Sequence, residues 1–397
     1  MKKASSARPL CSIVSAGCAV YGKREGFSGR ELFNEALDEL FLNCPKLEKK
    51  DVNALYVGQS FEIFEHQANT PTGFSNNYGL PNIPSVRVET ISSSGASSLR
   101  QGMLGVLSGT FDVVLCGAVE KMTTLETLDV SEVLSMGSDR PFEAWNGCTL
   151  PALNALVARE HMRRFGTTEE QLALVAVKNH RNGFENPKAF LRKIVTVKDV
   201  LESRKVCTPL KLLDCSPIAD GASCLAICKP EMARMYTDSA VEIIGTAQAS
   251  DCDVVFRDEL VGFKTTRIAA KKALEMAGQN IFDMDLVEVH DAFTINEIVA
   301  YEDLGMCAKG DGGKLIESGE TKIDGSIPVN PSGGLKSKGH PIASSGIGQA
   351  YEVFNQLGEG ATKIAPSRRV KDAKSAMTHS MGGAGLDVSV HIFRASK

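Results

Sequence analysis

Hydrophobic residues follow two alternating patterns along the chain. Short apolar runs predict buried strands at residues 11–15, 54–57, 86–89, 113–116, 224–228, 241–246, 286–289 and 388–393. Longer segments with an apolar residue every three or four positions predict amphipathic helices at residues 29–42, 99–108, 150–165, 168–182, 266–277 and 348–357. Because the two patterns alternate, we expect an α/β fold with a mainly parallel sheet. The first strand is expected to turn at Gly17.

The strand patterns form two groups. The first group occupies residues 1–122 and is completed by a return strand within 207–240, after a helical, charge-rich section at 123–206. The second group occupies residues 241–397. In each group one helix opens with small residues directly after a strand or loop, at 92–95 and at 339–346. This arrangement predicts two similar halves that face each other, with the helical section inserted into the first.

The composition is that of an ordinary globular protein, with 43% hydrophobic and 23% charged residues among 397. The 44 basic and 48 acidic residues are mixed along the chain and give a net charge of -4. Since no basic run of the phosphate-binding kind occurs, we expect no nucleic-acid partner. Lys188, Arg192 and Lys193, in the helical section, are interpreted as a solvated face. No segment approaches the roughly 20 apolar residues of a membrane span, so no membrane insertion is expected.

The eleven cysteines are irregularly spaced, and no two of them form a CxxC pair. This pattern predicts neither a metal site nor a disulfide framework, and unpaired thiols fit a cytoplasmic location. The basic start, Met1-Lys2-Lys3, followed by an apolar stretch, imitates a signal peptide. We interpret the stretch as a buried strand instead, because it is short and broken by serines.

Ser92 lies where a strand pattern gives way to a helix pattern, in the sequence Ser92-Ser-Ser-Gly95. A hydroxyl at the start of a helix faces backbone N–H groups and the positive end of the helix dipole, which suits a nucleophile that becomes an anion. Serine is also a common N-cap residue, and capping is the simpler interpretation of an isolated SSSG. The turn by itself leaves both interpretations open.

Two histidines lie at places where an α/β fold gathers its chemistry. His290 follows an apolar strand pattern and precedes a helix, although a structural histidine is the simpler interpretation when it is taken alone. His340 lies near the end of a stretch, residues 330–341, that contains three glycines and two prolines. Such a stretch holds its side chains in a position defined by the backbone, which an ordinary loop does not require. We therefore predict that His340 is catalytic and that Asn330 is a further candidate.

Residues 378–385 are predicted to form a glycine-rich turn between two strand-like runs. Close backbone amides in such a turn can stabilise an oxyanion. A phosphate-binding loop is not indicated, because no Lys-Ser or Lys-Thr pair follows in register.

These elements, in this order and spacing, resemble the thiolase family over nearly the whole chain. The resemblance rests on residues 13–17, 21–23, 111–122, 213–222, 290–293 (His-Asp-Ala-Phe), 330–335 (Asn-Pro-Ser-Gly-Gly-Leu) and 339–341 (Gly-His-Pro). The His-Asp-x-Phe form resembles the sterol-carrier-type and archaeal branch of the family.

The resemblance implies a layered α-β-α-β-α core and a reversible reaction in which CoA cleaves a 3-oxoacyl-CoA into two acyl-CoA molecules. It implies that Ser92 occupies the nucleophile position, that His340 is the base, and that His290 helps to bind the substrate oxygen. Backbone amides at Ser92 and Gly382 would form the oxyanion hole. CoA is then a substrate, with no bound cofactor or metal. A homodimer is implied, and several members of this branch act with a small zinc-containing OB-fold partner.

The chain departs from the family at its cysteines. Ser92 stands where the nucleophilic cysteine is expected, and Ser380 and Ala292 occupy the two positions where a second cysteine is found. A serine hydroxyl is a weaker nucleophile than a thiolate, and an ester returns its acyl group less readily than a thioester. Three explanations are open: a replacement made to trap a ligand, a natural serine with altered chemistry, or a subunit that binds acyl-CoA without turnover. Because His290 and His340 are retained, we predict an acyltransferase, with an impaired acyl-CoA-binding subunit as the alternative.

Overall fold

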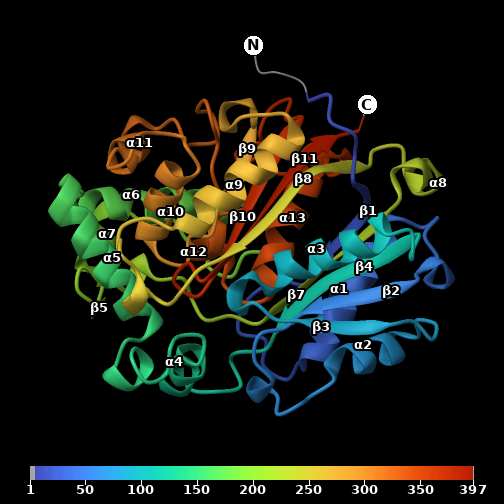
Figure 1. Cartoon of the computed structure of the whole chain (residues 1–397), viewed down its shortest axis with the longest axis horizontal. Coiled ribbons are helices and arrows are strands. Elements are labelled where there is room, and N and C mark those ends of the chain that lie inside the picture. Colours follow the sequence, from blue (N-terminus) through green and yellow to red (C-terminus); the bar gives the residue numbers. More distant parts are fainter. Residues whose placement is uncertain (1–4, 397) are drawn as a thin grey trace.

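The computed structural model describes residues 5–396, which form one large mixed sheet with helices around it (Figure 1). The strands of this sheet are β1 (Cys11–Cys18), β2 (Ala54–Gly58), β3 (Ser85–Val88), β4 (Val113–Glu120), β7 (Gly221–Cys228), β8 (Val241–Ser250), β9 (Leu286–Glu288), β10 (Ser375–Gly382) and β11 (Asp387–Ala395). A separate short pair consists of β5 (Lys205–Cys207) and β6 (Leu210–Lys211).

The α-helices of the described chain are α1 (Gly29–Asn43), α2 (Thr70–Tyr78), α3 (Ser94–Leu107), α4 (Thr127–Ser135), α5 (Leu150–Phe165), α6 (Glu169–Phe184), α7 (Val197–Glu202), α8 (Ala233–Tyr236), α9 (Lys264–Ala277), α10 (Thr294–Asp303), α11 (Gly312–Ser318), α12 (Gly334–Lys338) and α13 (Ser344–Leu357). The predicted α/β fold is confirmed.

The order of strands in the large sheet is β3-β2-β4-β7-β1-β8-β11-β10-β9. Three neighbouring pairs are parallel, namely β2 with β3, β2 with β4, and β9 with β10. The remaining neighbours are antiparallel. The prediction of a mainly parallel sheet is therefore wrong. The reason is that β10 and β11 form a hairpin, and β7 enters the sheet antiparallel to both of its neighbours.

The two parts of the sheet repeat one topology. The order β2-β4-β7-β1, with its first pair parallel and the next two antiparallel, is matched by β9-β10-β11-β8. In the second part, the segment around Val329 occupies the position equivalent to that of β3. It forms one parallel bridge to β9, between Val287 and Val329. This repetition supports the prediction of two similar halves; the residue boundaries predicted for the four sections stay a prediction.

Helices lie in layers around and between the two halves (Figure 1). α1 packs on β1 and β7, and α9 packs on β8 and β11. α3 and α13 contact each other and strands of both halves. Leu99 and Met103 of α3 and Ile347 and Val353 of α13 are completely buried in one apolar cluster between the halves. Because each buried side chain of this size contributes roughly 1.5–3 kcal/mol, these two helices are held firmly in place.

The expected turn at Gly17 is wrong, since β1 continues through Gly17 to Cys18. A Cβ atom on Gly17 would lie 1.9 Å from the carbonyl oxygen of Ala36 in α1. The glycine therefore allows a helix to approach the strand closely and does not reverse the chain.

Both central helices begin earlier than their apolar periodicity predicts. α3 begins at Ser94 and α13 at Ser344, about one turn before the predicted starts. Their first turns consist mostly of serine and glycine, which are buried by tertiary contact and give no apolar signal.

The predicted turn at residues 378–385 is wrong in its first part. Thr378 to Gly382 belong to β10, and only the following residues connect it to β11. Every residue of β10 is buried, including Thr378, His379 and Ser380. A strand with both faces covered shows no alternation of polar and apolar residues when its polar side chains have partners inside the protein.

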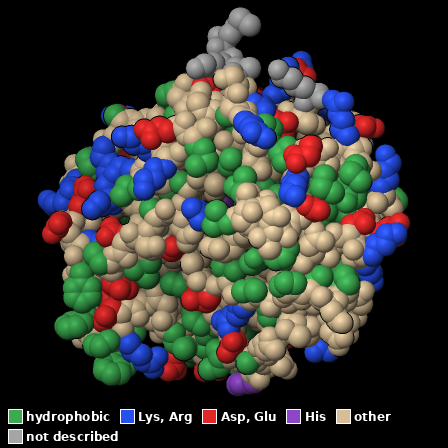
Figure 2. Space-filling model, turned by 45° about the vertical axis from the view of Figure 1, so that its right-hand side comes forward, with side chains coloured by type: hydrophobic (Ala, Val, Ile, Leu, Met, Phe, Trp, Pro, Cys, Tyr) green, Lys and Arg blue, Asp and Glu red, His purple; other side chains and the backbone are tan. Residues whose placement is uncertain are grey.

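Charged side chains of both signs lie beside one another on the face drawn in Figure 2. Within residues 5–396, no helix is both long enough and apolar enough to cross a membrane.

Candidate active site

Ser92 lies in a single 3-10 turn, Ile91–Ser93, directly before α3, and is 3% exposed. Ile91 has φ 53°, a left-handed conformation that is strained for a β-branched residue. The Ser60 hydroxyl donates to the carbonyl of Ile91 at 2.7 Å and helps to hold this turn. The N-cap residue of α3 is Ser93, and its side chain makes no capping bond. Capping therefore does not explain Ser92.

The starts of α3 and α13 touch backbone to backbone. A Cβ atom on Gly95 would lie 2.4 Å from the carbonyl oxygen of Ala343, and one on Gly346 would lie 2.6 Å from the amide nitrogen of Ala96. Only glycine permits this approach. It brings the turn of Ser92 against the segment that carries His340.

His290 and His340 form an edge-to-face pair with ring centroids 5.1 Å apart. His290 follows β9. His340 lies in the irregular segment before α13, and its backbone N–H donates to the carbonyl of Pro217 at 3.3 Å. The two histidines are 2% and 7% exposed. Residues some fifty positions apart in the sequence therefore meet in one buried site.

Hydrogen bonds select one tautomer of His340. Its Nδ1 lies 2.7 Å from the hydroxyl oxygen of Ser345, and that hydroxyl can donate to the carbonyl of Pro341 at 3.1 Å. Because a hydroxyl has one proton and a carbonyl only accepts, this arrangement places a proton on Nδ1. The lone pair is then on Nε2 of His340, which can act as a base.

Burial keeps the histidines of the site neutral. Loss of water lowers the pKa of His340 to about 3. The pKa of His290 is also well below its ordinary value, first because of burial and then because of repulsion from protonated His340 and His379. Among the described residues, Nδ1 of His290 has no hydrogen-bond partner. It is therefore available to a substrate atom.

β10 connects the serine turn to the histidine pair. The Ser380 hydroxyl donates to the carbonyl of Ser92 at 3.4 Å. His379 precedes Ser380 in β10, and its Nδ1 accepts the backbone N–H of His290 at 3.4 Å. Gly382 lies against the same turn, since a Cβ there would be 2.3 Å from the carbonyl oxygen of Thr90. The structure thus places Ser92, His290, Ser380 and Gly382 in one connected region.

Asn330 holds the segment of His290 in place through hydrogen bonds of its side chain. Its side-chain oxygen accepts the N–H of Val289 at 2.8 Å, and its amide nitrogen donates to Glu297 at 2.7 Å. Glu297 also accepts from Asn179 and forms a buried ion pair with Lys178, both at 2.7 Å. These contacts make Asn330 a positioning residue.

Four contributors were not predicted: Ile91, Ser345, His379 and Glu297. Ser345 lies five positions after His340, which precedes the start of α13 at Ser344, so no helical spacing signalled this contact. The roles of the others come from contacts between distant segments, which left no local signal.

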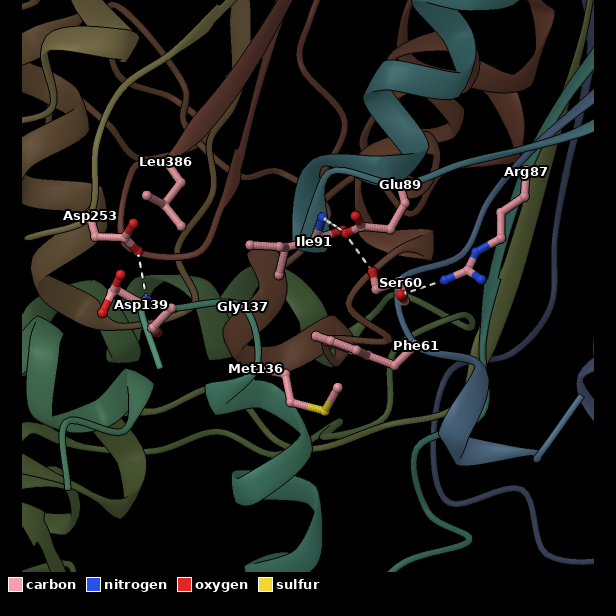
Figure 3. Close-up of a pocket in the computed structure, with 11 residues that line it drawn as sticks. Ser60, Phe61, Arg87, Glu89, Ile91, Met136, Gly137, Asp139, Asp253 and Leu386 are labelled. Carbon is pink, nitrogen blue, oxygen red and sulfur yellow. Dashed lines mark hydrogen bonds between the residues drawn. The ribbon is translucent and has the colours of Figure 1, made fainter. Parts of the chain in front are cut away.

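A cavity of about 410 Å³ lies beside the serine turn (Figure 3). Ile91 reaches into it from the turn, Arg87 and Glu89 line it from the end of β3, and Met136 comes from the segment after α4. The two histidines do not line it. Within residues 5–396, no group of three or more His, Cys, Asp or Glu side chains is arranged to hold a metal ion.

Comparison with known proteins agrees with this architecture. A family model described as the thiolase N-terminal domain matches residues 11–231, and one described as thiolase C-terminal domain-like matches residues 247–395. An acetyl-CoA acetyltransferase of Methanothermobacter thermautotrophicus is 46% identical over 87% of this chain and 90% of its own length. Sterol carrier protein 2 of Bos taurus is 32% identical over 78% of this chain and 59% of its own length.

Solved structures share the fold at low sequence identity. An aldolase described as Ltp2-ChsH2(DUF35) superposes with a TM-score of 0.85 at 23% identity, covering 97% of both chains. Human mitochondrial 3-ketoacyl-CoA thiolase in complex with CoA superposes with a TM-score of 0.75 at 18% identity, covering 98% of this chain and 99% of that one. The matched family models together span nearly the whole sequence, as the motifs around Ser92, His290 and His340 predicted. The chain belongs to the thiolase family.

Proposed function

We propose that the chain is an acyl-CoA C-acyltransferase that uses Ser92 as its nucleophile and cleaves a 3-oxoacyl-CoA with CoA, or joins two acyl-CoA molecules in reverse. The observation that supports this proposal is a strained serine turn at a helix start that contacts the segments carrying two neutral, buried imidazoles, through Gly95 against Ala343 and through Ser380 of β10. The acetyltransferase relative and the CoA complex of a solved neighbour support CoA as the substrate.

In the cleavage direction, the Ser92 hydroxyl attacks the 3-oxo carbon while Nε2 of His340 takes its proton. Backbone amides at Ser92 and Gly382 would stabilise the resulting oxyanion. The bond between C2 and C3 then breaks. The acetyl-CoA enolate, hydrogen-bonded to His290, takes the proton back from His340, and an ester remains on Ser92. CoA gives its thiol proton to His340, attacks this ester, and leaves as the new acyl-CoA while the Ser92 hydroxyl is restored.

Serine makes this route slower than the same route with cysteine. The imidazole of His340, with a pKa near 3, binds a proton weakly, while a serine hydroxyl is far less acidic than a thiol. Neither Ser380 nor Ala292 supplies a thiol as a second acid and base. The proton must therefore pass through the histidines or the substrate.

We also propose that the chain forms a homodimer through β3 and acts in the cytoplasm with a small zinc-containing OB-fold partner. β3 is an edge strand, and its Val86 is 45% exposed, which supports pairing with a second copy. One solved neighbour is described as the aldolase Ltp2-ChsH2(DUF35), which supports a partner subunit. The cysteines of the described chain are free thiols, which supports a reducing compartment.

The test compares thiolysis of acetoacetyl-CoA by the chain and by its Ser92→Cys, Ser92→Ala and His340→Ala variants. We expect Ser92→Cys to be faster by at least about a hundredfold, and the other two variants to lose the activity of the chain. Intact-protein mass spectrometry should show an acetyl ester that is absent from Ser92→Ala. If Ser92→Cys is inert while CoA still binds, the acyltransferase proposal fails and the acyl-CoA-binding subunit takes its place.

A further inference from the structure

Glu120 carries a completely buried carboxyl group at the end of β4, which the proposed reaction does not use. Other carboxyl groups pair with a cation, as Asp220 does with Lys121 at 2.6 Å and Glu39 with Lys188 at 2.7 Å. Lys188 is half-buried in this pair, so the interpretation of it as part of a solvated face is wrong. Glu120 instead accepts backbone N–H groups of the segment after β2. Burial raises the pKa of Glu120 to about 8, so the side chain is mostly uncharged at neutral pH.

The pairing of two strands places Glu120 beside Ser60. β2 and β4 run parallel with Gly58 opposite Ala118, so the residues two positions further along each strand are neighbours. The N–H of Ser60 donates to the carboxyl of Glu120 at 2.9 Å. The carbonyl of Ser60 accepts from Arg87 of β3 at 2.7 Å. The backbone of Ser60, which is 3% exposed, is therefore fixed on both of its sides.

Ser60 in turn holds the residue that precedes the nucleophile. Its hydroxyl donates to the carbonyl of Ile91 at 2.7 Å (Figure 3). Ile91 has φ 53°, a conformation that a β-branched residue keeps only where its surroundings impose it. Ser94 also donates to this carbonyl, and Glu89 accepts the N–H of Ile91 at 2.6 Å, but both lie within three positions of Ile91. The bond from Ser60 ties the turn to the sheet.

The conformation of Ile91 determines the direction of the Ser92 side chain, because the two residues are consecutive in one tight turn. If φ of Ile91 relaxes toward its ordinary range, the hydroxyl of Ser92 moves with the chain. A displacement of a reacting group by about 1 Å can lower a rate by about a hundredfold. Binding of the substrate elsewhere in the site does not depend on this displacement.

We propose that Glu120 and Ser60 are positioning residues for the nucleophile: Glu120 fixes the backbone of Ser60, and the Ser60 hydroxyl holds Ile91 in the conformation that orients Ser92. This role rests on the function proposed for Ser92. Both residues act through Ile91, so their loss should lower kcat and leave KM nearly unchanged.

The test measures kcat and KM for thiolysis of acetoacetyl-CoA in the Ser92→Cys background, where turnover is expected to be faster. We expect Ser60→Ala to lower kcat by about tenfold or more with KM within about twofold, and Ser60→Thr, which keeps the hydroxyl, to stay within about threefold of the background. Ser15→Ala is the matched control. It removes a buried hydroxyl that donates to the carbonyl of Leu40 at 2.6 Å, between β1 and α1, and should keep the kcat of the background.

Two variants of Glu120 test the next contact. Glu120→Met keeps the length of the side chain but removes its oxygens, whereas Glu120→Gln keeps a carbonyl oxygen for the N–H of Ser60. Glu120→Met should therefore lower kcat about as much as Ser60→Ala does, and Glu120→Gln much less. Because the two residues act in one chain of contacts, the double variant Ser60→Ala/Glu120→Met should lose little more than either single variant. Losses that multiply in the double variant would overturn the part assigned to Glu120.

Alkylation of residue 92 by iodoacetamide in the Ser92→Cys background, followed by peptide mass spectrometry, reports the placement of this side chain without turnover. We expect Ser60→Ala to slow the alkylation by about tenfold, and Ser60→Thr to restore it. If the background does not turn over acetoacetyl-CoA, the proposed function fails and the alkylation rates alone decide the role of Ser60. An unchanged alkylation rate in Ser60→Ala would overturn the proposal. Equal losses of kcat in Ser15→Ala and Ser60→Ala would do so as well.

Discussion

His391 offers a quantitative test of how strongly this core excludes protons. It lies in β11 and is 1% exposed. Its Nε2 donates to the carbonyl of Ala96 in α3 at 3.0 Å, and its Nδ1 lies 3.0 Å from the hydroxyl oxygen of Thr246. Because burial removes water from the ring, and because Arg100 repels a positive charge there, the pKa of His391 is lowered to about 4. The folded chain thus keeps this side chain neutral at any mildly acidic pH.

The unfolded chain does not exclude the proton, since the pKa of an exposed histidine is about 6.5. Between these two pKa values the unfolded state binds more protons, so the free energy of unfolding falls as the pH falls. At pH 5.5 the unfolded side chain is about nine-tenths protonated, which lowers the free energy of unfolding by about 1.4 kcal/mol relative to pH 7.5. Above about pH 7.5 this effect vanishes.

The assay is urea unfolding at pH 7.5 and pH 5.5 for the chain and for His391→Gln. Glutamine can still donate to the carbonyl of Ala96 but does not titrate, and the other buried histidines and carboxyls contribute equally to both proteins. We expect the stability advantage of His391 over glutamine to shrink by about 1.4 kcal/mol between the two pH values. An advantage that stays constant within about 0.5 kcal/mol would refute the reasoning, because the ring would then titrate as an exposed histidine does.

Three other substitutions test buried contacts of the site and of the fold. Ser345→Ala removes the acceptor that fixes the tautomer of His340, so kcat should fall about tenfold with little change in KM, and 15N NMR should show both tautomers. Gly95→Ala places a methyl group 2.4 Å from a facing carbonyl oxygen and should lower the free energy of unfolding by roughly 2 kcal/mol or more, whereas Gly73→Ala, with its nearest atom 3.7 Å away, should not. Asp220 of the segment before β7 forms a buried ion pair with Lys121, which follows β4, at 2.6 Å, and Asp220→Asn should lower the free energy of unfolding by about 3–5 kcal/mol in chemical unfolding.

The parts of the site that could be predicted are those whose backbone needs special residues. Glycine and proline residues identified the stretch from Asn330 to His340 in the sequence. A cluster of serine and glycine after a strand pattern identified the start of α3. Such residues are chosen for backbone conformation, and conformation is a local property that the sequence displays directly. The prediction of His340 followed from it, whereas His290 was indicated by the end of an apolar strand pattern and by the resemblance to the thiolase family.

The remaining parts depend on which segments meet. His379 faces His290 because β10 lies beside β9, and that pairing joins residues about ninety positions apart. The mixed direction of the sheet likewise depends on the entry of β7, which is not encoded in the apolar pattern of the strand itself. Polar residues inside β10 hid a strand whose two faces are both covered. Local patterns therefore identified the elements and their special turns, but not their directions or their polar contacts.

The position of residue 92 is determined by structure around it and not by its own side chain. The strained conformation of Ile91 is maintained by Ser60 and by the close contact of α3 with α13. On the opposite side, the segment of His290 is anchored through Asn330 to a buried network. Because these supports make no use of the Ser92 hydroxyl, we expect cysteine to occupy the same turn as serine does. The architecture of the site is thus separable from the chemistry at residue 92, and a change of one atom there tests the chemistry alone.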